Sequence, residues 1–371
     1  MSALKKPNAS ALPKPKPGIL DISPYVAGKS KTKDAAAKIL KLSSNESSLG
    51  PSPKALKAYS EHAAKLHRYP DSSVLELRKA IAAVHGLDAE RIVCGAGSDE
   101  LIGLLTHAYA GEGDEVLYSE HGFLMYKIYA QGSGATPVTA AEKNLTADVN
   151  AILAKVTPKT RIVYLANPNN PTGSYLAASE LKRLHDGLPG DVILAIDSAY
   201  AEFADKADYS CGKELVDMTQ NTVMLRTFSK IYGLSSLRIG WGYFPAAIAD
   251  VLNRVRGPFN VSGVSIAVGI AAVEDVAYTE QVKKHNNIWL AWMSEELTKL
   301  GLLVHPSIAN FLLVEFTSPG KTSAAANVFL MDRGIIAREV VNYGLPKCLR
   351  ITIGTEEENR AVVDALRAFL A

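Results

Sequence analysis

The sequence predicts an α/β protein, in which a mostly parallel, mixed sheet is covered by helices and is followed by a smaller α+β domain. The first observation behind this prediction is a series of short apolar segments without polar alternation, which is typical of strands buried on both faces. The second is that helical patterns alternate with these segments. The third is the length of 371 residues, which suits one large domain and a smaller companion.

Helices and strands alternate through the first two thirds of the chain. A helix is expected over residues 51–64, where prolines stand at the start and apolar residues recur at helical spacing. Another is expected over residues 99–110, because the segment opens with acidic residues and Ser98 can cap it. Two more helices are expected from Phe123 onward and over residues 178–188. The buried strands expected in this region are residues 91–94, 115–118, 161–166, 192–196 and 222–225.

The last third of the chain has a different pattern. Long helices begin at Ser262 and end near Leu300, and short strands then alternate with helices, which favours an α+β domain. These shorter elements are expected at residues 311–316, 323–333, 349–353 and 356–369. The resulting division is a disordered lead of residues 1–18, an N-terminal arm of 19–50 belonging to the small domain, a large domain of 51–261 and a small domain of 262–371.

Composition argues against several classes of function. Lys and Arg number 40 and Asp and Glu 38, a net charge of +2, so no nucleic-acid or membrane partner is expected. No stretch reaches the roughly 18 apolar residues of a spanning helix, and the Lys- and Pro-rich start lacks the apolar core of a signal peptide. Cys94, Cys211 and Cys348 are far apart and match neither a disulfide framework nor a standard zinc site. We therefore expect a soluble cytoplasmic protein without a metal.

Polar and glycine-rich segments come directly after four of the predicted strands. In open α/β sheets, ligands bind at the carboxyl ends of the strands. We therefore expect these four segments to converge on one site. They are Gly95–Glu100 (GAGSDE), Asn167–Gly173 (NPNNPTG), Asp197–Tyr200 (DSAY) and Arg226–Lys230 (RTFSK).

Lys230 is a candidate nucleophile. It follows a strand, lies among glycine, serine and apolar residues, and has Arg226 and Arg238 on either side. Neighbouring cations and partial desolvation both disfavour the charged form of a lysine, which suits a Schiff-base lysine. Thr227, Ser229 and Arg238 offer hydroxyls and guanidinium donors for a phosphate group. The alternative for Lys230 alone is an ordinary surface charge.

Asp197 ends an apolar strand and is either a turn aspartate or a functional carboxylate. As a functional group, it would pair with the protonated pyridine nitrogen of a cofactor, so that the ring can accept electrons from a carbanion. Tyr200 and Asn170 could both reach the phenolate oxygen of such a ring. The segment Gly95–Glu100 leads into a helix, so it is either an anion site at the helix start or an ordinary glycine turn.

With these candidate residues and segments in this order, the sequence resembles the fold type I aminotransferases. Within that group it resembles the histidinol-phosphate aminotransferases. The Asn-Pro-Thr-Gly and Ser-Lys motifs are common to many aminotransferases, whereas the first and last matching runs are more specific. The runs span nearly everything after the lead. They are Lys41–Glu46 (KLSSNE) with Leu49–Pro53, Arg68–Asp71 (RYPD), Gly97–Ile102, Asn167–Gly173, the segment around Lys230, and Leu349–Thr355 (LRITIGT).

The resemblance implies pyridoxal 5′-phosphate as the cofactor and a ping-pong mechanism. Lys230 would bind the cofactor as a Schiff base and move the proton between the substrate Cα and the cofactor C4′. Asp197 would pair with the pyridine nitrogen, and Tyr200 and Asn170 would contact O3′. Phe123 would stack on the ring. The phosphate would be held by the backbone of Ser98 and Asp99 and by Thr227, Ser229 and Arg238.

The resemblance also implies the substrate contacts and the assembly. Arg350 would bind the carboxylate or phosphate of the substrate. Arg338 and Tyr25, together with Asn170, would lie near the rest of the substrate. Tyr69 would reach the cofactor phosphate of a neighbouring subunit, which implies a homodimer with shared active sites.

The expected reaction is amino transfer between histidinol phosphate and 2-oxoglutarate, with imidazole acetol phosphate and glutamate as the products. Aromatic amino acids are the alternative donors, and another cofactor chemistry such as decarboxylation is a further alternative. A non-catalytic regulatory module is disfavoured, because the region before Ser43 is too short for a DNA-binding domain and Lys230 is retained. Departures from the family pattern at Ser198, at Glu120–Phe123 and at Ser47–Ser48 bear on substrate preference and not on the reaction.

Overall fold

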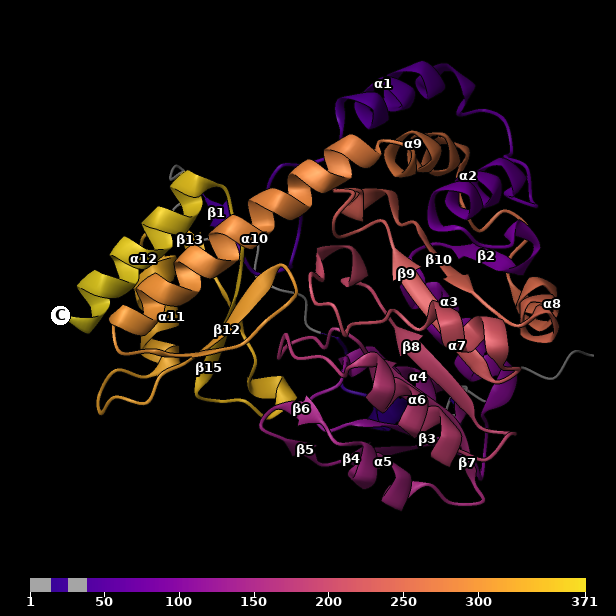
Figure 1. Ribbon diagram of the computed structural model, residues 1–371, viewed down its shortest axis with the longest axis horizontal. Coiled ribbons are helices and arrows are strands. Elements are labelled where there is room, and N and C mark those ends of the chain that lie inside the picture. Colours follow the sequence, from indigo (N-terminus) through magenta and orange to yellow (C-terminus); the bar gives the residue numbers. More distant parts are fainter. Residues whose placement is uncertain (1–14, 26–38) are drawn as a thin grey trace, which may run out of the picture.

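The computed structural model describes residues 15–25 and 39–371. Over these residues the chain forms a large α/β unit and a smaller α+β unit, and the long helix α10 (Val276–Lys299) runs from one to the other (Figure 1). Most of the expected disordered lead, residues 1–14, lies outside the described residues. None of the helices in the described part of the chain is long and apolar enough to cross a membrane.

The large unit contains a seven-stranded sheet with the order β2-β10-β9-β8-β7-β3-β4. β10 is antiparallel to both of its neighbours and the other pairs are parallel, which confirms the predicted mixed sheet. All five strands predicted for this region are present, and β4 and β10 are additional. The strands are β2 (Ile92–Gly95), β3 (Glu115–Ser119), β4 (Thr136–Ala140), β7 (Thr160–Ala166), β8 (Ile193–Asp197), β9 (Thr222–Thr227) and β10 (Gly240–Tyr243).

Helices cover both faces of this sheet because its strands are apolar on both sides. On one face, α3 (Ser98–Tyr109), α4 (Leu124–Ser133) and α8 (Ala246–Val255) enclose a core with alternate residues of the strands. The opposite face packs against α5, α6 and α7, and toward β2 and β10 against α1, α2 and α9. These helices are α1 (Pro53–His62), α2 (Leu75–His85), α5 (Val149–Lys155), α6 (Ala178–Gly187), α7 (Lys213–Met218) and α9 (Gly263–Val273).

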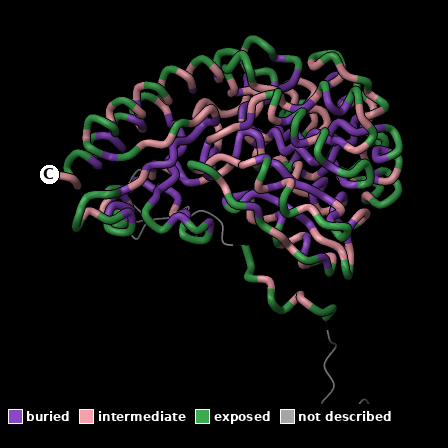
Figure 2. Tube along the Cα trace, turned by 60° about the horizontal axis from the view of Figure 1, so that its bottom comes forward, coloured by how far each residue is buried: buried purple, intermediate pink, exposed green. Residues whose placement is uncertain are grey.

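The small unit is built on an antiparallel sheet with the order β11-β12-β15-β14. One face of the sheet packs against α10, α11 and α12, and the other carries Leu313 and Cys348 against Leu124 and Leu145 of the large unit. The buried cores of both units are visible as purple segments in Figure 2. The elements are β11 (Leu303–His305), β12 (Phe311–Glu315), α11 (Ser323–Met331), β14 (Arg338–Glu339), β15 (Cys348–Thr352) and α12 (Glu356–Leu370).

Two short strand pairs complete the fold. β1 (Leu40–Lys41) pairs in parallel with β13 (Ile335–Ile336), and this pairing supports the expected place of the N-terminal arm in the small domain. β5 (Glu142–Lys143) and β6 (Thr146–Ala147) form a hairpin. Because α9 packs on α1 and α2, we propose that the boundary between the domains lies after α9 rather than at Ser262.

The expected capping role of Ser98 is wrong. Ser98 is the first residue of α3, and the residue before the helix is Gly97, which has a φ of 89° and makes no side-chain cap. Such a φ is accessible to glycine at little cost. The first N–H groups of α3 therefore receive no cap from a side chain at Gly97.

Candidate active site

A cavity of about 470 Å³ lies at the carboxyl ends of β7, β8 and β9, where the small unit meets the large one. The four segments predicted to converge all contribute to its wall. Every predicted site residue lines it except Tyr69. These residues are Tyr25, Ser98, Asp99, Phe123, Asn170, Asp197, Tyr200, Thr227, Ser229, Lys230, Arg238, Arg338 and Arg350.

Lys230 follows β9 and is half-buried, with its Nζ 3.2 Å from the backbone oxygen of Ser44, to which it donates. Desolvation and, to a smaller extent, the nearby positive charge of Arg350 together lower the pKa of the Lys230 ammonium to about 8. A sizeable neutral fraction is therefore present near neutral pH, and a neutral amine is the form that acts as nucleophile or base.

Asp197 is the last residue of β8 and is buried. Its Oδ2 accepts a hydrogen bond of 2.8 Å from the hydroxyl of Tyr126, whereas its Oδ1 has no partner among the described residues. Burial raises the pKa of this carboxyl to about 6. A buried carboxylate oxygen without a partner is costly, so the site favours a cationic N–H donor opposite Oδ1.

The start of α3 has the features that suit an anion. Ser98 and Asp99 are its first residues, and free N–H groups at a helix start attract negative charge. The guanidinium of Arg238 packs against this helix start. Its Nη2 is so close to Gly97 that a Cβ at that residue would be only 2.6 Å away. A Cβ on Gly240 would be 2.1 Å from the Ser98 nitrogen, so the close approach of β10 requires a glycine at that position.

Hydroxyl groups also lie close to Arg238 in the cavity wall. Nη1 of Arg238 lies 3.4 Å from Oγ of Ser229, and Oγ1 of Thr227 accepts from the Ser229 backbone nitrogen at 3.1 Å. All three residues line the cavity together with the start of α3. Backbone N–H groups, hydroxyls and one guanidinium around a single spot suit a phosphate group.

Two buried arginines face each other across strands of the small unit. Arg338 on β14 and Arg350 on β15 are direct cross-strand partners, and they are 7% and 5% exposed. Arg350 donates to Oδ1 of Asn170 and, at 2.7 Å, to the backbone oxygen of Ser43. Its buried Nε has no hydrogen-bond partner within the described part of the chain. Burial lowers the pKa of Arg350. The pair gives the cavity a strongly cationic wall suited to an anionic ligand.

Sequence reasoning assigned no role to two residues that hold the site in place. Tyr126, on α4, donates to Asp197, and nothing in the sequence links these distant positions. Asn45 donates 2.9 Å hydrogen bonds from its side chain to the Tyr200 hydroxyl and from its backbone nitrogen to Thr352. Asn45 lies in the KLSSNE run, so the resemblance offered a signal for it. Burial raises the pKa of Tyr200 to about 12, so its phenol stays protonated.

Tyr69 lies outside the cavity. Its side chain is 83% exposed and stacks on Phe259, with ring centroids 4.6 Å apart. The expected role of Tyr69 is in the site of a neighbouring subunit, and an exposed aromatic ring outside its own cavity is compatible with that role.

Comparisons with known proteins identify the family of this chain. The family model for aminotransferase class I and II matches residues 37–366. The histidinol-phosphate aminotransferase of Paramagnetospirillum magneticum is 58% identical over 96% of this chain and 99% of its own length. That of Rhodospirillum rubrum is 54% identical over 97% and 98%.

Solved structures show the same arrangement of the chain. The histidinol-phosphate aminotransferase from Sinorhizobium meliloti, in complex with pyridoxal-5′-phosphate, superposes with a TM-score of 0.90 at 29% identity, covering 98% of this chain and 99% of that one. Thermus thermophilus aspartate aminotransferase with maleate gives a TM-score of 0.79 at 19% identity over 90% and 92%, which shows a shared fold only.

Proposed function

This chain belongs to the aminotransferase class I and II family, with the fold of the type I enzymes, and we propose that it moves an amino group between histidinol phosphate and 2-oxoglutarate. The observation that carries the proposal is the identity of 52–58% to curated histidinol-phosphate aminotransferases over 96–97% of the chain. The products would be imidazole acetol phosphate and glutamate. Measuring the rates of the enzyme with histidinol phosphate and with phenylalanine tests the substrate.

The cavity fits pyridoxal 5′-phosphate as the cofactor. Oδ1 of Asp197, which has no partner in residues 15–25 and 39–371, suits a protonated ring nitrogen, while the start of α3 with Arg238 suits the phosphate. When bound, the cofactor supplies a cationic ring that stabilises negative charge at the substrate Cα. The residues proposed to hold it are Ser98, Asp99, Phe123, Asn170, Asp197, Tyr200, Thr227, Ser229, Lys230 and Arg238, with Tyr69 from a second subunit.

Lys230 is proposed to attach the cofactor and to carry the proton. With its pKa lowered to about 8, Nζ can be neutral at working pH, take a proton from the substrate Cα and deliver it again. The Ser44 oxygen accepts a hydrogen bond from Nζ and orients it. The N-terminal arm therefore takes part in positioning the base.

Asp197 is proposed to keep the ring nitrogen protonated. Tyr126 holds one oxygen of the carboxylate and leaves the other for the ring. Tyr200 and Asn170 are proposed to contact O3′, and both are already fixed by hydrogen bonds, from Asn45 and from Arg350 respectively. Prearranged donors of this kind lower the cost of reorganisation during the reaction.

The arginine pair is proposed to select the substrate. In a ping-pong reaction, one cavity must accept both a phosphate ester and a dicarboxylate. Arg338 and Arg350 lie side by side and can bind either group through bidentate contacts. A phosphate carries up to two charges and matches two guanidiniums better than one. An aromatic amino acid, the alternative donor, would need Arg350 alone.

We also propose a homodimer and a cytoplasmic location. Tyr69 stacks on the exposed Phe259, and Leu56, Tyr59 and Leu66 in the preceding part of the chain are also exposed, which supports a covered surface. A dimer would let Tyr69 reach the phosphate of the second subunit. The three cysteines are free, as is usual in a reducing compartment.

A further inference from the structure

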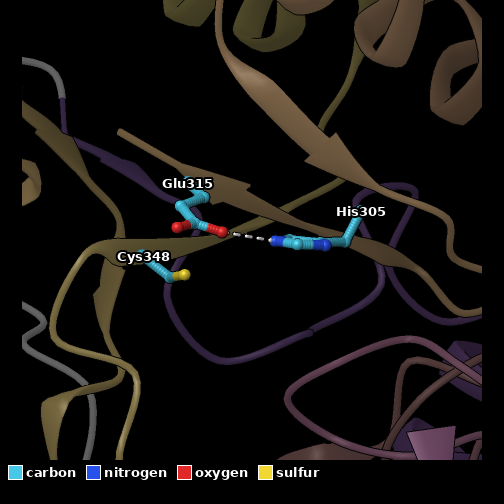
Figure 3. Close-up of side chains that lie close together, drawn as sticks. All are labelled: His305, Glu315 and Cys348. Carbon is cyan, nitrogen blue, oxygen red and sulfur yellow. Dashed lines mark hydrogen bonds and ion pairs between the residues drawn. The ribbon is translucent and has the colours of Figure 1, made fainter. Parts of the chain in front are cut away.

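The small sheet carries a second cluster of reactive side chains, away from the cavity described above. His305, Glu315 and Cys348 lie on three neighbouring strands, β11, β12 and β15 (Figure 3). Glu315 and Cys348 are direct cross-strand partners, and His305 is opposite Leu313, two residues from Glu315. Cross-strand partners and residues two apart share a face of a sheet. All three side chains therefore project from the same face.

Their ligand atoms are close together. Nε2 of His305 lies 3.1 Å from Oε2 of Glu315, and both lie within 4.8 Å of Sγ of Cys348. A tetrahedral zinc ion with bonds of about 2.0–2.3 Å places its ligand atoms roughly 3.3–3.7 Å apart. The Nε2–Oε2 distance lies just below this range, and the distances to Sγ are at most 4.8 Å, about 1 Å above it. Among the residues that the structure describes, this is the one group of His, Cys and acidic side chains with such a spacing.

The chemical types of the three ligands indicate the ion. One sulfur, one imidazole nitrogen and one carboxylate oxygen form a set that zinc accepts, whereas calcium and magnesium require oxygen ligands. Cys348 is 4% exposed, which protects a metal-bound sulfur, and His305 and Glu315 are half-buried. The backbone pairs Glu315 and Cys348 in the sheet, so two of the ligands are held on a rigid frame.

We propose that Nε2 of His305, Oε2 of Glu315 and Sγ of Cys348 bind one zinc ion per chain, with water as a fourth ligand. A second cavity of about 730 Å³, which His305 lines, gives water access to the ion. Binding replaces the hydrogen bond between the imidazole and the carboxylate, the neutral imidazole keeps its one proton on Nδ1, and the thiol proton of Cys348 is displaced to solvent. No electron is transferred. In the absence of the ion, burial and the charge of Glu315 raise the pKa of the Cys348 thiol to about 12.

The ion would stabilise the sheet that carries Arg350, the residue proposed to bind the substrate. β11 is a three-residue edge strand, and the ion ties it to β12 and β15, the strand that also carries Arg350. Just after β11, the backbone nitrogen of Ile308 donates a 3.1 Å hydrogen bond to the oxygen of Gly173, in the same loop as Asn170. The role is structural. Sequence spacing pointed to no zinc site, because the three ligands meet only through strand pairing.

Metal analysis of the cofactor-loaded enzyme tests the site. After equilibrium dialysis against zinc, the wild type is expected to hold one tightly bound ion per chain. His305→Gln and Cys348→Ser should each weaken zinc binding at least about a hundredfold. Cys211→Ser, which changes a cysteine outside the cluster, should bind zinc like the wild type. Equal binding by the wild type and Cys348→Ser, or no tight zinc in the wild type, would overturn the proposal.

A second readout separates zinc binding from folding defects and from amino transfer. Zinc at about a hundredfold above its Kd should raise the Tm of the wild type on the order of 3–5 °C, but not that of His305→Gln. Cobalt in place of zinc should give tetrahedral visible bands, at wavelengths longer than the cofactor absorbs, that are absent in Glu315→Gln. If Cys348→Ser does not fold, His305→Gln and Glu315→Gln still test the proposal. Equal Tm shifts in the wild type and His305→Gln would also overturn the proposal.

Discussion

The hydroxyl of Tyr126 donates a 2.8 Å hydrogen bond to Oδ2 of Asp197, while Oδ1 of the same carboxylate is buried without a partner among the described residues. One oxygen is thus fixed by the protein and the other is left for a cationic donor. Burial raises the pKa of Asp197, whereas the hydrogen bond from Tyr126 lowers it and so opposes part of that effect. Tyr126 is therefore a positioning residue for the group that we propose to protonate the cofactor ring.

Replacing Tyr126 by phenylalanine should slow the reaction and change its pH dependence. Losing one hydrogen bond to a charged group costs about 1.5–3 kcal/mol, so kcat/KM should fall roughly tenfold or more. Without this donor the pKa of Asp197 rises, and more of it is neutral at a given acidic pH. The acidic limb of the rate profile should therefore shift to higher pH.

Tyr164→Phe is the matched control. Tyr164 stacks on Tyr126, with centroids 4.7 Å apart, but its hydroxyl bonds to Thr106 and not to Asp197. This variant should lose some stability and keep the pH profile of the wild type. Identical pH profiles for Tyr126→Phe and the wild type would show that Tyr126 only fills space.

Lys230 should be the residue that carries the cofactor. Its amine has a pKa lowered to about 8, so it is neutral far more often than an ordinary lysine. Borohydride reduction of the loaded enzyme, followed by peptide mapping, should place pyridoxal phosphate on Lys230. Lys230→Ala should bind the cofactor weakly and should not turn over. A label on another lysine would refute the assignment of the site.

Mixing two inactive variants should show whether active sites are shared. If Tyr69 serves the partner subunit, refolding Tyr69→Ala together with Lys230→Ala should restore part of the activity, because one site of the mixed dimer then has neither defect. Arg238→Ala mixed with Lys230→Ala is the control, since both of these residues line the cavity of their own chain and every site keeps one defect. No recovery in the first mixture, or a monomer in sedimentation, would refute sharing.

Arg338 should distinguish the two classes of donor. It is the cross-strand partner of Arg350, and a phosphate uses both guanidiniums where a carboxylate uses one. Arg338→Gln should lower kcat/KM for histidinol phosphate about ten- to a hundredfold and leave phenylalanine little changed. An equal loss for both donors would show that Arg338 supports the sheet and does not select the substrate.

The strands that position the site could be predicted where burial on both faces produces an uninterrupted run of apolar residues. β7, β8 and β9 are continuous apolar segments because both faces of the sheet are covered, and each ends at a residue next to the cavity. β10 was missed because its sequence, Gly-Trp-Gly-Tyr, has two glycines, which are rare in strands. Its Gly240 is needed because the Ser98 nitrogen leaves no room for a side chain.

The contacts between distant segments could not be read from the sequence. The hydrogen bond of Tyr126 to Asp197 and that of Asn45 to Tyr200 depend on how helices and the N-terminal arm pack. The sequence predicts Ser98 as the cap of α3 because serine favours that position, but Gly97 occupies it. At this position the φ of 89°, which glycine adopts at little cost, decides the cap instead of the local preference of serine.

The most direct test of the central proposal is the specificity of the wild-type enzyme. With 2-oxoglutarate as the acceptor, kcat/KM should be measured for histidinol phosphate and for phenylalanine under the same conditions. The arginine pair predicts a preference for histidinol phosphate of at least about tenfold. A higher kcat/KM for phenylalanine, or no amino transfer from histidinol phosphate, would contradict the account.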